Sequence, residues 1–249
     1  MTTSKSISSR AAMMLLLMLL TSVSAWAQDS DDYPYCGDPD DNDGQNVTWS
    51  LSGTLSSGTL IDCTLTISGT GAMANYDFFD DSDESPWYRY IGYITSIVIK
   101  DGVTSIGENA FIGCNALKTV TIGNGVKTIG ENAFYGCSAL GTVTIPDNVK
   151  TIGDYAFIGC TALETVTIGN GVETIGDGAF SGCPITTLSI NMENISDEAF
   201  LGSSLSTVTF GTNVKTIGEG AFFGCTNLGT VTIPDNVKTI GTDAFLNCI

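Results

Sequence analysis

A unit of about 23 residues recurs from residue 94 to the end of this 249-residue chain, and it limits the possible folds more than any other feature. The stretch "TVTIGNGVKTIGENAFYGC" from Thr119 returns as "TVTIPDNVKTIGDYAFIGC" from Thr142 and as "TVTIGNGVETIGDGAFSGC" from Thr165. The dipeptide Ala-Phe marks seven copies, spaced 23, 23, 23, 20, 22 and 23 residues apart. A period in the low twenties is typical of solenoids that stack one coil per repeat.

Each unit predicts two short extended segments. Val120 and Ile122 alternate with Thr119 and Thr121, the period-two pattern of a half-buried strand. A Gly-Asn-Gly or Pro-Asp-Asn turn follows, then the extended piece "VKTI", and then "ENAFYGC", for which we expect one helical or 3₁₀ turn. Because no unit can cover its apolar residues alone, neighbours must stack. The predicted fold is a solenoid of mainly short β-strands with a parallel sheet along one side.

The unit "L-x-T-V-T-I-x-x-x-V-x-x-I-G-x-x-A-F-x-x-C" resembles the BspA-like leucine-rich repeats of bacterial surface proteins and some parasite surface proteins. The resemblance covers residues 94–249 closely. The preceding segment, with "NVTWSLSGTLSSGTLIDCTLTISG" and a Ser-Pro-Trp-Tyr stretch, is similar to the N-terminal cap of that family. The resemblance implies a BspA-type solenoid preceded by a β-hairpin-like cap. It also implies adhesion to host matrix proteins, host cells or other bacteria, but it names no binding residues.

The chain begins with the features of a secretory signal peptide. Lys5 and Arg10 precede the apolar run "AAMMLLLMLLTSVSA", and a small-residue pattern ends at Ala27. The run is too short and wrongly flanked for a spanning helix. We expect cleavage after Ala27 and a secreted or cell-surface protein with no membrane insertion after signal removal. The predicted organisation is a signal peptide (1–27), an acidic flexible leader (28–45), an N-terminal cap (46–93) and a solenoid of about seven units, the last incomplete (94–249).

The charge balance limits the partners. The chain has 9 basic and 27 acidic residues, and loss of Lys5 and Arg10 with the signal leaves 7 and 27, a net charge of −20. Such a chain cannot neutralise phosphates, which argues against nucleic acid or anionic membrane as partners.

The acidic stretch "DPDDNDGQ" departs from a calcium loop because Gly44 falls one place late and Trp49 replaces the expected Glu. We interpret it as part of a solvated leader.

Six of the eight cysteines occupy one repeat position, three residues after the Phe: Cys114, Cys137, Cys160, Cys183, Cys225 and Cys248. The chain contains no histidine and no C-x-x-C pair, so no zinc pattern fits, and we predict no metal or cofactor. We interpret these cysteines as small buried apolar residues, with equivalent positions on the outer side of a curved solenoid too far apart to bridge.

Cys36 and Cys63 lie outside the repeats, and a disulfide between them is one candidate for the cap in an oxidising compartment.

Outward-facing hydroxyl residues form the first candidate ligand face. They should make two parallel rows on the exposed sheet, although threonine also simply suits a half-solvated strand. The rows contain none of the Trp, Tyr or Arg typical of tight protein hot spots, so glycan binding and, more remotely, ice binding stay open as alternatives. The residues are Thr119, Thr121, Thr142, Thr144, Thr165, Thr167, Thr187, Ser189, Thr207, Thr209, Thr230 and Thr232.

The second candidate patch gathers the aromatic side chains that precede the repeats. Most of them should cover the open end of the first coil, as a solenoid requires, and the rest could bind a partner. The patch comprises Tyr76, Phe78, Phe79, Trp87, Tyr88, Arg89 and Tyr90.

Two irregular places complete the list. The unit between Phe180 and Ala199 is short and loses its second extended piece, which is either a decayed repeat or a change of curvature that shapes a pocket around Asn191, Met192 and Glu193. The final "AFLNCI" shows no polar cap, so end-to-end self-association through that end is a hypothesis.

These features favour an adhesive or interaction module that binds an extracellular protein or glycan. The alternative is a carbohydrate-binding or structural component of an extracellular matrix or biofilm. We predict no enzymatic activity, because a chain without histidine has no Ser-His or Cys-His pair and carboxylates such as Glu131 and Asp154 fall on solvated turns. A glycosidase with two carboxylates in one cleft is the single chemistry that composition leaves open.

Overall fold

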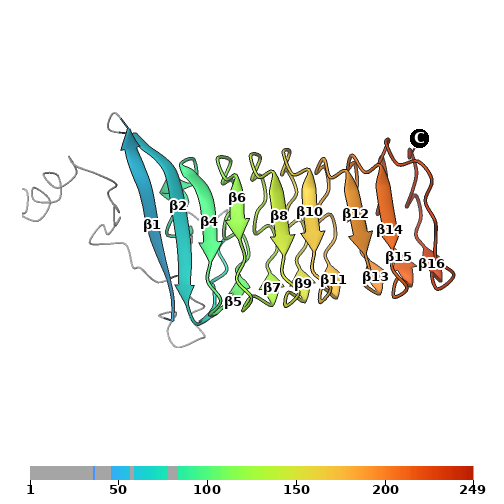
Figure 1. The fold of residues 1–249 in the computed structure, drawn as a ribbon, viewed down its shortest axis with the longest axis horizontal. Coiled ribbons are helices and arrows are strands. Elements are labelled where there is room, and N and C mark those ends of the chain that lie inside the picture. The colour runs from blue at the N-terminus through green and yellow to red at the C-terminus, as the bar shows by residue number, and fades with distance from the viewer. Residues whose placement is uncertain (1–35, 37–45, 57–58, 78–83, 249) are drawn as a thin grey trace, which may run out of the picture.

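The computed structural model describes residues 36, 46–56, 59–77 and 84–248 as one elongated β-solenoid (Figure 1). An antiparallel hairpin of β1 (Val47–Ser56) and β2 (Thr59–Gly69) stands at its N-terminal end. The β2 strand pairs in parallel with the first repeat strand, so the hairpin continues directly into the coils. The predicted signal peptide and most of the predicted leader lie outside the described residues.

Two rows of strands run along the solenoid (Figure 1), whereas the sequence indicated a sheet on one side. The first row holds the T-V-T-I strands, namely β4 (Ile94–Ile99), β6 (Thr119–Thr121), β8 (Thr142–Ile145), β10 (Thr165–Ile168), β12 (Thr187–Ile190) and β14 (Thr207–Phe210). The second row holds β3 (Gly71–Ala72), β5 (Val103–Ile106), β7 (Thr128–Ile129), β9 (Thr151–Ile152), β11 (Thr174–Ile175), β13 (Asn194–Ile195), β15 (Thr216–Ile217) and β16 (Thr239–Ile240). Strand pairs between coils are parallel and in register, as with Thr165 opposite Thr142.

The Ala-Phe segments are successions of turns, not helices. Asn132 and Asn109, each directly before the Ala, have left-handed φ angles of 51° and 55°, and an α-helix cannot continue through a left-handed residue. The turns are closed by bonds three residues apart, such as the Tyr135 N–H to the Asn132 carbonyl at 3.0 Å. Among the described residues, the 3₁₀ segment η1 (Tyr88–Tyr90) is the one assigned helix.

A column of stacked aromatic rings forms the centre of the core. Consecutive Phe rings, one per coil, lie 5.0 to 5.6 Å apart between centroids. Trp87 stacks on the first of them, Phe111, at 5.4 Å, and its Nε1 donates to the Ala110 carbonyl at 2.8 Å. The column therefore begins under the hairpin, with Trp87 closing the first coil. Its members are Phe111, Phe134, Phe157, Phe180, Phe200, Phe222 and Phe245.

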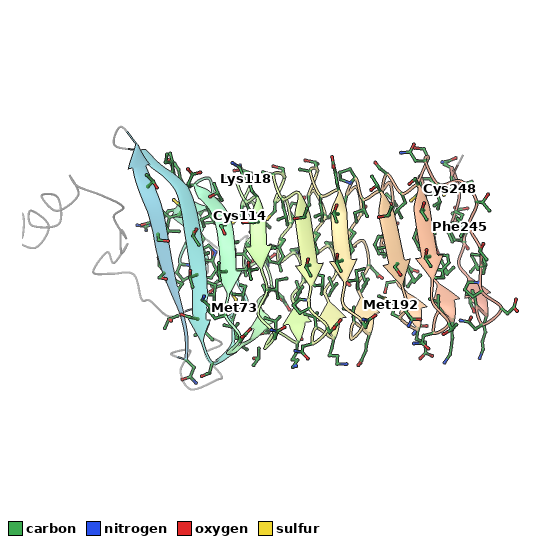
Figure 2. All side chains as sticks on the ribbon, viewed as in Figure 1. Met73, Cys114, Lys118, Met192, Phe245 and Cys248 are labelled. Atoms are coloured by element: carbon green, nitrogen blue, oxygen red, sulfur yellow. The ribbon has the colours of Figure 1, made fainter. Side chains whose placement is uncertain are left out.

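A column of cysteines runs beside the aromatic column, with Cys114 and Cys248 at its two ends (Figure 2). Each Sγ from the second copy onward donates to the Phe carbonyl of the preceding coil, as Cys160 does to Phe134 at 3.3 Å. Ser203 replaces the cysteine in the fifth copy, and its Oγ lies 3.1 Å from the Sγ of Cys225. The side chains of successive coils are therefore close, and the argument that distance prevents bridging was wrong. All six thiols are free.

The glycine that follows the second-row strand lets the coils approach closely. A Cβ added at Gly153 would lie 2.6 Å from the backbone nitrogen of Glu131 in the preceding coil. We expect Gly153→Ala to lower the free energy of unfolding by about 1–3 kcal/mol through overpacking. Urea denaturation measures this change. The matched control is Ser196→Ala, at the same repeat position but in the irregular unit, where we expect a change within about 0.5 kcal/mol. Equal losses in the two variants would contradict the close-approach explanation.

The last described coil leaves apolar side chains exposed. Ile240 and Leu246 are each 48% exposed, whereas Ala244 is buried. Self-association through this end stays a prediction.

Candidate functional site

The predicted hydroxyl rows lie on the outer face of the first strand row. All twelve residues are exposed, and the strand register places Thr144 opposite Thr167 and Ser189 opposite Thr209. Thr230 and Thr232 are exposed too, but their segment is not a strand. We call these twelve residues the threonine face. It is a polar surface that consists mostly of side chains with short, stiff rotamers.

The threonine face is interrupted between β10 and β12. The β10 strand pairs with β8 and β12 pairs with β14, but within the described part of the chain no strand pair joins β10 to β12. The second row is interrupted at the same place, because β11 and β13 are also unpaired with each other. Three residues separate β12 from β13 (191–193), against five between β10 and β11 (169–173), so the shorter coil cannot follow its neighbour. We call this place the coil step.

The aromatic column remains intact at the coil step. The Phe180 N–H donates to the Ala199 carbonyl at 2.9 Å, and the rings of Phe180 and Phe200 are 5.5 Å apart. The two coils are therefore joined along their Ala-Phe edge and by one backbone hydrogen bond beside the first strand row, from the Thr186 N–H to the Glu164 carbonyl at 3.4 Å, while neither strand row of the described residues forms a pair across the step. The irregular unit keeps its second extended piece as β13, so the sequence-based view that this piece is lost was wrong.

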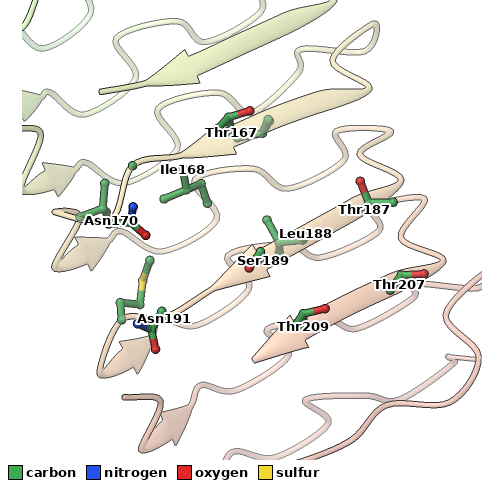
Figure 3. Close-up of a pocket in the computed structure, with 13 residues that line it drawn as sticks. Thr167, Ile168, Asn170, Thr187, Leu188, Ser189, Asn191, Thr207 and Thr209 are labelled. Carbon is green, nitrogen blue, oxygen red and sulfur yellow. The ribbon is translucent and has the colours of Figure 1, made fainter. Parts of the chain in front are cut away.

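A groove opens on the threonine face at the coil step (Figure 3). Its upper part has a volume of about 380 Å³, and an adjoining lower part has about 430 Å³. The two parts share four lining residues, so we treat them as one step groove. Hydroxyl and amide groups form the rim, and Val166, Leu188 and Met192 contribute apolar surface. The polar lining residues are Thr167, Asn170, Glu173, Thr187, Ser189, Asn191, Glu193, Asn194, Thr207, Thr209, Asn213 and Lys215.

One backbone acceptor in the lower part of the groove has no cross-coil backbone donor among the described residues. The Lys150 carbonyl accepts the N–H groups of Glu173 and Thr174 at 2.9 and 3.1 Å. The Glu193 carbonyl likewise accepts those of Lys215 and Thr216 at 2.7 and 3.2 Å. The Glu173 carbonyl holds the same position in its coil, yet among the described residues it accepts no backbone bond from the next coil.

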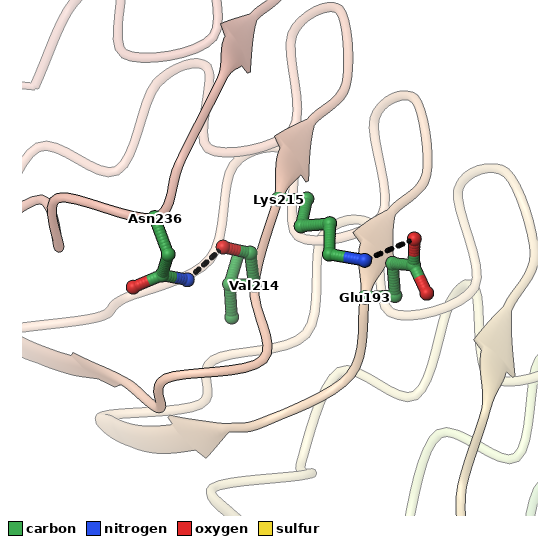
Figure 4. A network of polar contacts seen from close by, with 4 residues as sticks. All are labelled: Glu193, Val214, Lys215 and Asn236. Atoms are coloured by element: carbon green, nitrogen blue, oxygen red, sulfur yellow. Dashed lines mark hydrogen bonds and ion pairs between the residues drawn. The ribbon is translucent and has the colours of Figure 1, made fainter.

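Two ion pairs flank the coil step. The Nζ of Lys150 lies 2.7 Å from Glu173, and the Nζ of Lys215 lies 2.9 Å from Glu193 (Figure 4). In the coil beyond, the Asn236 amide donates to the Val214 carbonyl. The side chains of Glu173 and Glu193 are 69% and 59% exposed, so both carboxylates face solvent as well as their lysines.

The aromatic patch serves mainly as a cap. Trp87 is fully buried, with Trp49 and Tyr76 edge-on to it at 6.2 and 5.8 Å between ring centroids, and so it does not belong to an exposed surface. Tyr76 and Tyr90 pack against the core, Tyr88 is half-buried, and Arg89 is exposed. Phe78 and Phe79 lie outside the described residues. Among the described members of the patch, Arg89 alone is exposed.

The candidate disulfide is incompatible with the hairpin register. The Cys36 N–H donates to the Val47 carbonyl, and Val47 pairs with Gly69. Cys63 lies six residues before Gly69 on β2, a separation of roughly 20 Å at about 3.3 Å per residue. Bridged cysteines need Cα atoms within about 7 Å. Both thiols are free and buried, so this structure does not contain the candidate Cys36–Cys63 disulfide.

Burial suppresses thiol chemistry throughout the chain. It raises the pKa of Cys36, Cys114 and Cys183 to about 12, and that of Cys137 well above its ordinary value. Such thiols are protonated at neutral pH and are weak nucleophiles. Within the described parts of the chain, no group of three or more His, Cys, Asp or Glu side chains is placed to hold a metal ion.

Sequence reasoning named part of the groove lining, including Thr167 on the regular coil, and missed the rest. Asn191, Met192 and Glu193 were named from the short unit, and all three line it. Asn170 and Glu173 come from a regular coil, which carries no local signal. Their role follows only from the fact that a shortened coil separates from the coil before it. Aligning Glu193 with Glu173 at the same repeat position could have found them.

Parallel coils, an aromatic column and a polar outer face define a β-solenoid of the leucine-rich repeat class. Residues 84–204 and 193–249 match the model of the BspA type leucine rich repeat region, in six copies. The chain therefore belongs to the BspA-type leucine-rich repeat family. Leucine-rich repeat proteins generally bind other proteins and are generally non-catalytic, and the BspA-like ones are typically surface or secreted proteins.

Comparison with solved structures supports the fold through one of them, TpLRR, and also finds other leucine-rich repeat proteins at lower TM-scores. The leucine-rich repeat protein TpLRR of T. pallidum is 22% identical over 81% of this chain and 90% of its own, with a TM-score of 0.56. A leucine-rich repeat protein from Eubacterium ventriosum is 19% identical over 81% and 96%, with a TM-score of 0.30. The pneumococcal vaccine antigen PcpA is 14% identical over 89% and 78%, with a TM-score of 0.39. A search of curated proteins found no match.

One further observation concerns the membrane. In the ranges that the structure describes, no helix has the length and apolar character needed to cross a bilayer.

Proposed function

We propose that this protein acts at the cell exterior as an adhesive module that binds a partner protein at the step groove, the part of the threonine face that lies at the coil step. The observation that carries the proposal is the coil step, where both strand rows open while the aromatic column holds. Within the described residues the first row also lacks a pair between β6 and β8, but there β7 and β9 remain paired in the second row. At the coil step both described rows lack a pair, and the groove there is lined by hydroxyl, amide and apolar groups. Concave sites with a few convergent polar groups are the usual form of binding sites.

Secretion supports the same proposal from the sequence. The predicted signal peptide, with cleavage after Ala27, takes the chain out of the cell, where the candidate partners are host matrix proteins, host cells or other bacteria. The strongly acidic composition keeps nucleic acid among the improbable partners.

The test is a binding screen of the purified chain (residues 28–249) against immobilised matrix proteins. Thr167→Glu and Thr209→Glu each place a charge on the rim of the groove, and Thr144→Glu places the same charge on the same row outside it. We expect the rim variants to weaken binding at least about tenfold, and the control to bind as the parent does. Equal binding by all four proteins would reject the groove as the contact.

A glycan array run in parallel tests the second candidate, a carbohydrate-binding or structural role in an extracellular matrix or biofilm. The hydroxyl and amide lining favours it, because these groups pair with sugar hydroxyls. Binding on the array that the rim variants lose would replace the protein partner with a glycan.

A further inference from the structure

The lower part of the step groove is rich in hydrogen-bond acceptors. Glu173 and Glu193 line it from the two sides of the coil step, and each carboxylate is also in contact with a lysine. The equivalent carbonyls of Lys150 and Glu193 each accept two N–H groups from the next coil, but the Glu173 carbonyl accepts none from the described residues of the next coil. A guest that supplies several N–H donors would satisfy all three groups at once.

The order of charges along the solenoid leads to the same place. The repeat position that Glu173 occupies reads Lys127, Lys150, Glu173, Glu193, Lys215 and Lys238 from coil to coil. Two acidic side chains therefore follow each other only across the coil step. Each glutamate pairs with a lysine of the coil that lies away from the coil step. The two glutamates therefore stand on either side of the gap between β11 and β13, which do not pair in the described part of the chain.

A planar guanidinium matches this arrangement better than an ammonium ion. It offers five N–H donors in a fixed fork, and it pairs with carboxylates in two-point contacts. Val172 and Met192, which line both parts of the groove, provide apolar surface for the aliphatic stem of the same side chain.

We propose that the step groove takes an arginine side chain, presented by an extended segment of the partner protein, with the guanidinium between Glu173 and Glu193. The inference rests on the proposed function, because it names the chemistry of the partner at the same site. It also assigns Lys150 and Lys215 a role as internal competitors, since each already pairs with one of the two glutamates.

The test uses nine-residue Ala/Ser peptides with a central arginine, lysine or citrulline, with binding followed by fluorescence anisotropy. Citrulline keeps the shape of arginine but has no charge. We expect the arginine peptide to bind about tenfold more tightly than the citrulline peptide, and the preference to weaken at high salt. The Glu173→Gln/Glu193→Gln variant should lose the preference. The matched control, Glu131→Gln/Glu219→Gln, removes two exposed carboxylates outside the groove and should keep it.

A variant with the opposite sign separates recognition from a structural effect. Lys215→Met frees Glu193 from its internal partner, so we expect the arginine peptide to bind more tightly. Equal affinity for arginine and citrulline, a preference that survives in the double Gln variant, or no peptide binding at millimolar concentration would each overturn the inference. If the rim threonine variants still abolish binding to a matrix protein in that case, the proposed function stands without it.

Discussion

Raising the pH from 8 to 10 is expected to lower the free energy of unfolding by about 4 kcal/mol through three cysteines alone. Folding raises the pKa of Cys36, Cys114 and Cys183 from the ordinary 9.0 to about 12, because burial disfavours the thiolate. Below pH 9 these thiols are protonated in both states and have no effect. Above pH 9 the unfolded chain loses protons that the folded chain retains, so stability falls by about 1.4 kcal/mol per thiol at pH 10.

Urea denaturation in reducing buffer at pH 8, 9 and 10 measures this loss. Cys183→Ala provides the internal control, since it removes one of the three thiols. Whatever its stability at pH 8, we expect its decline between pH 8 and 10 to be about 1.4 kcal/mol smaller than that of the parent. An unfolding free energy that stays constant over this range would show that the cysteine column is not sealed from water.

Phe157→Ala is expected to lower the free energy of unfolding by about 3–5 kcal/mol. Phe157 is fully buried in the aromatic column, with ring centroids 5.1 Å from Phe134 and 5.0 Å from Phe180. Its removal leaves a cavity between two coils that cannot close, because the backbone ladder on either side fixes their separation. Chemical denaturation again measures the loss.

The control for that variant is Tyr135→Ala, an aromatic truncation directly beside the column. Tyr135 is 45% exposed, so we expect a loss below about 1 kcal/mol. Similar losses at Phe157 and Tyr135 would mean that the column adds little to coil stacking.

The repeated unit was sufficient to predict the solenoid, because the alternation of Val120 and Ile122 with threonine fixes which side chains face inward. The turn structure was not predictable in the same way. Asn132 and Tyr155 adopt left-handed φ angles at one repeat position, and asparagine but not tyrosine signals such a conformation. The tyrosine is held there by the coils on either side of it.

Long-range relations were the harder part. The cap cysteines suggested a bridge, and only the pairing of Val47 with Gly69 shows how far Cys63 lies from Cys36. The short unit indicated a pocket around Asn191, but its other wall comes from Glu173, whose own repeat is regular. A sequence with a repeat reveals what each coil has in common. A site that depends on the relation between two coils needs the structure.

The coil step also affects how the molecule yields to force. At every other described step between repeat coils, at least one strand ladder assists the aromatic column in holding the coils together. At the coil step no strand pair of the described residues assists the Ala-Phe edge, and one backbone hydrogen bond, from the Thr186 N–H to the Glu164 carbonyl at 3.4 Å, joins the coils beside the first strand row. Bending at this step would change the width of the groove. Two stiff blocks thus share one compliant joint, and the joint coincides with the groove. A partner bound across both blocks would stiffen the joint. A pulling force that bends the joint would therefore weaken binding, and a bound partner would resist the bending.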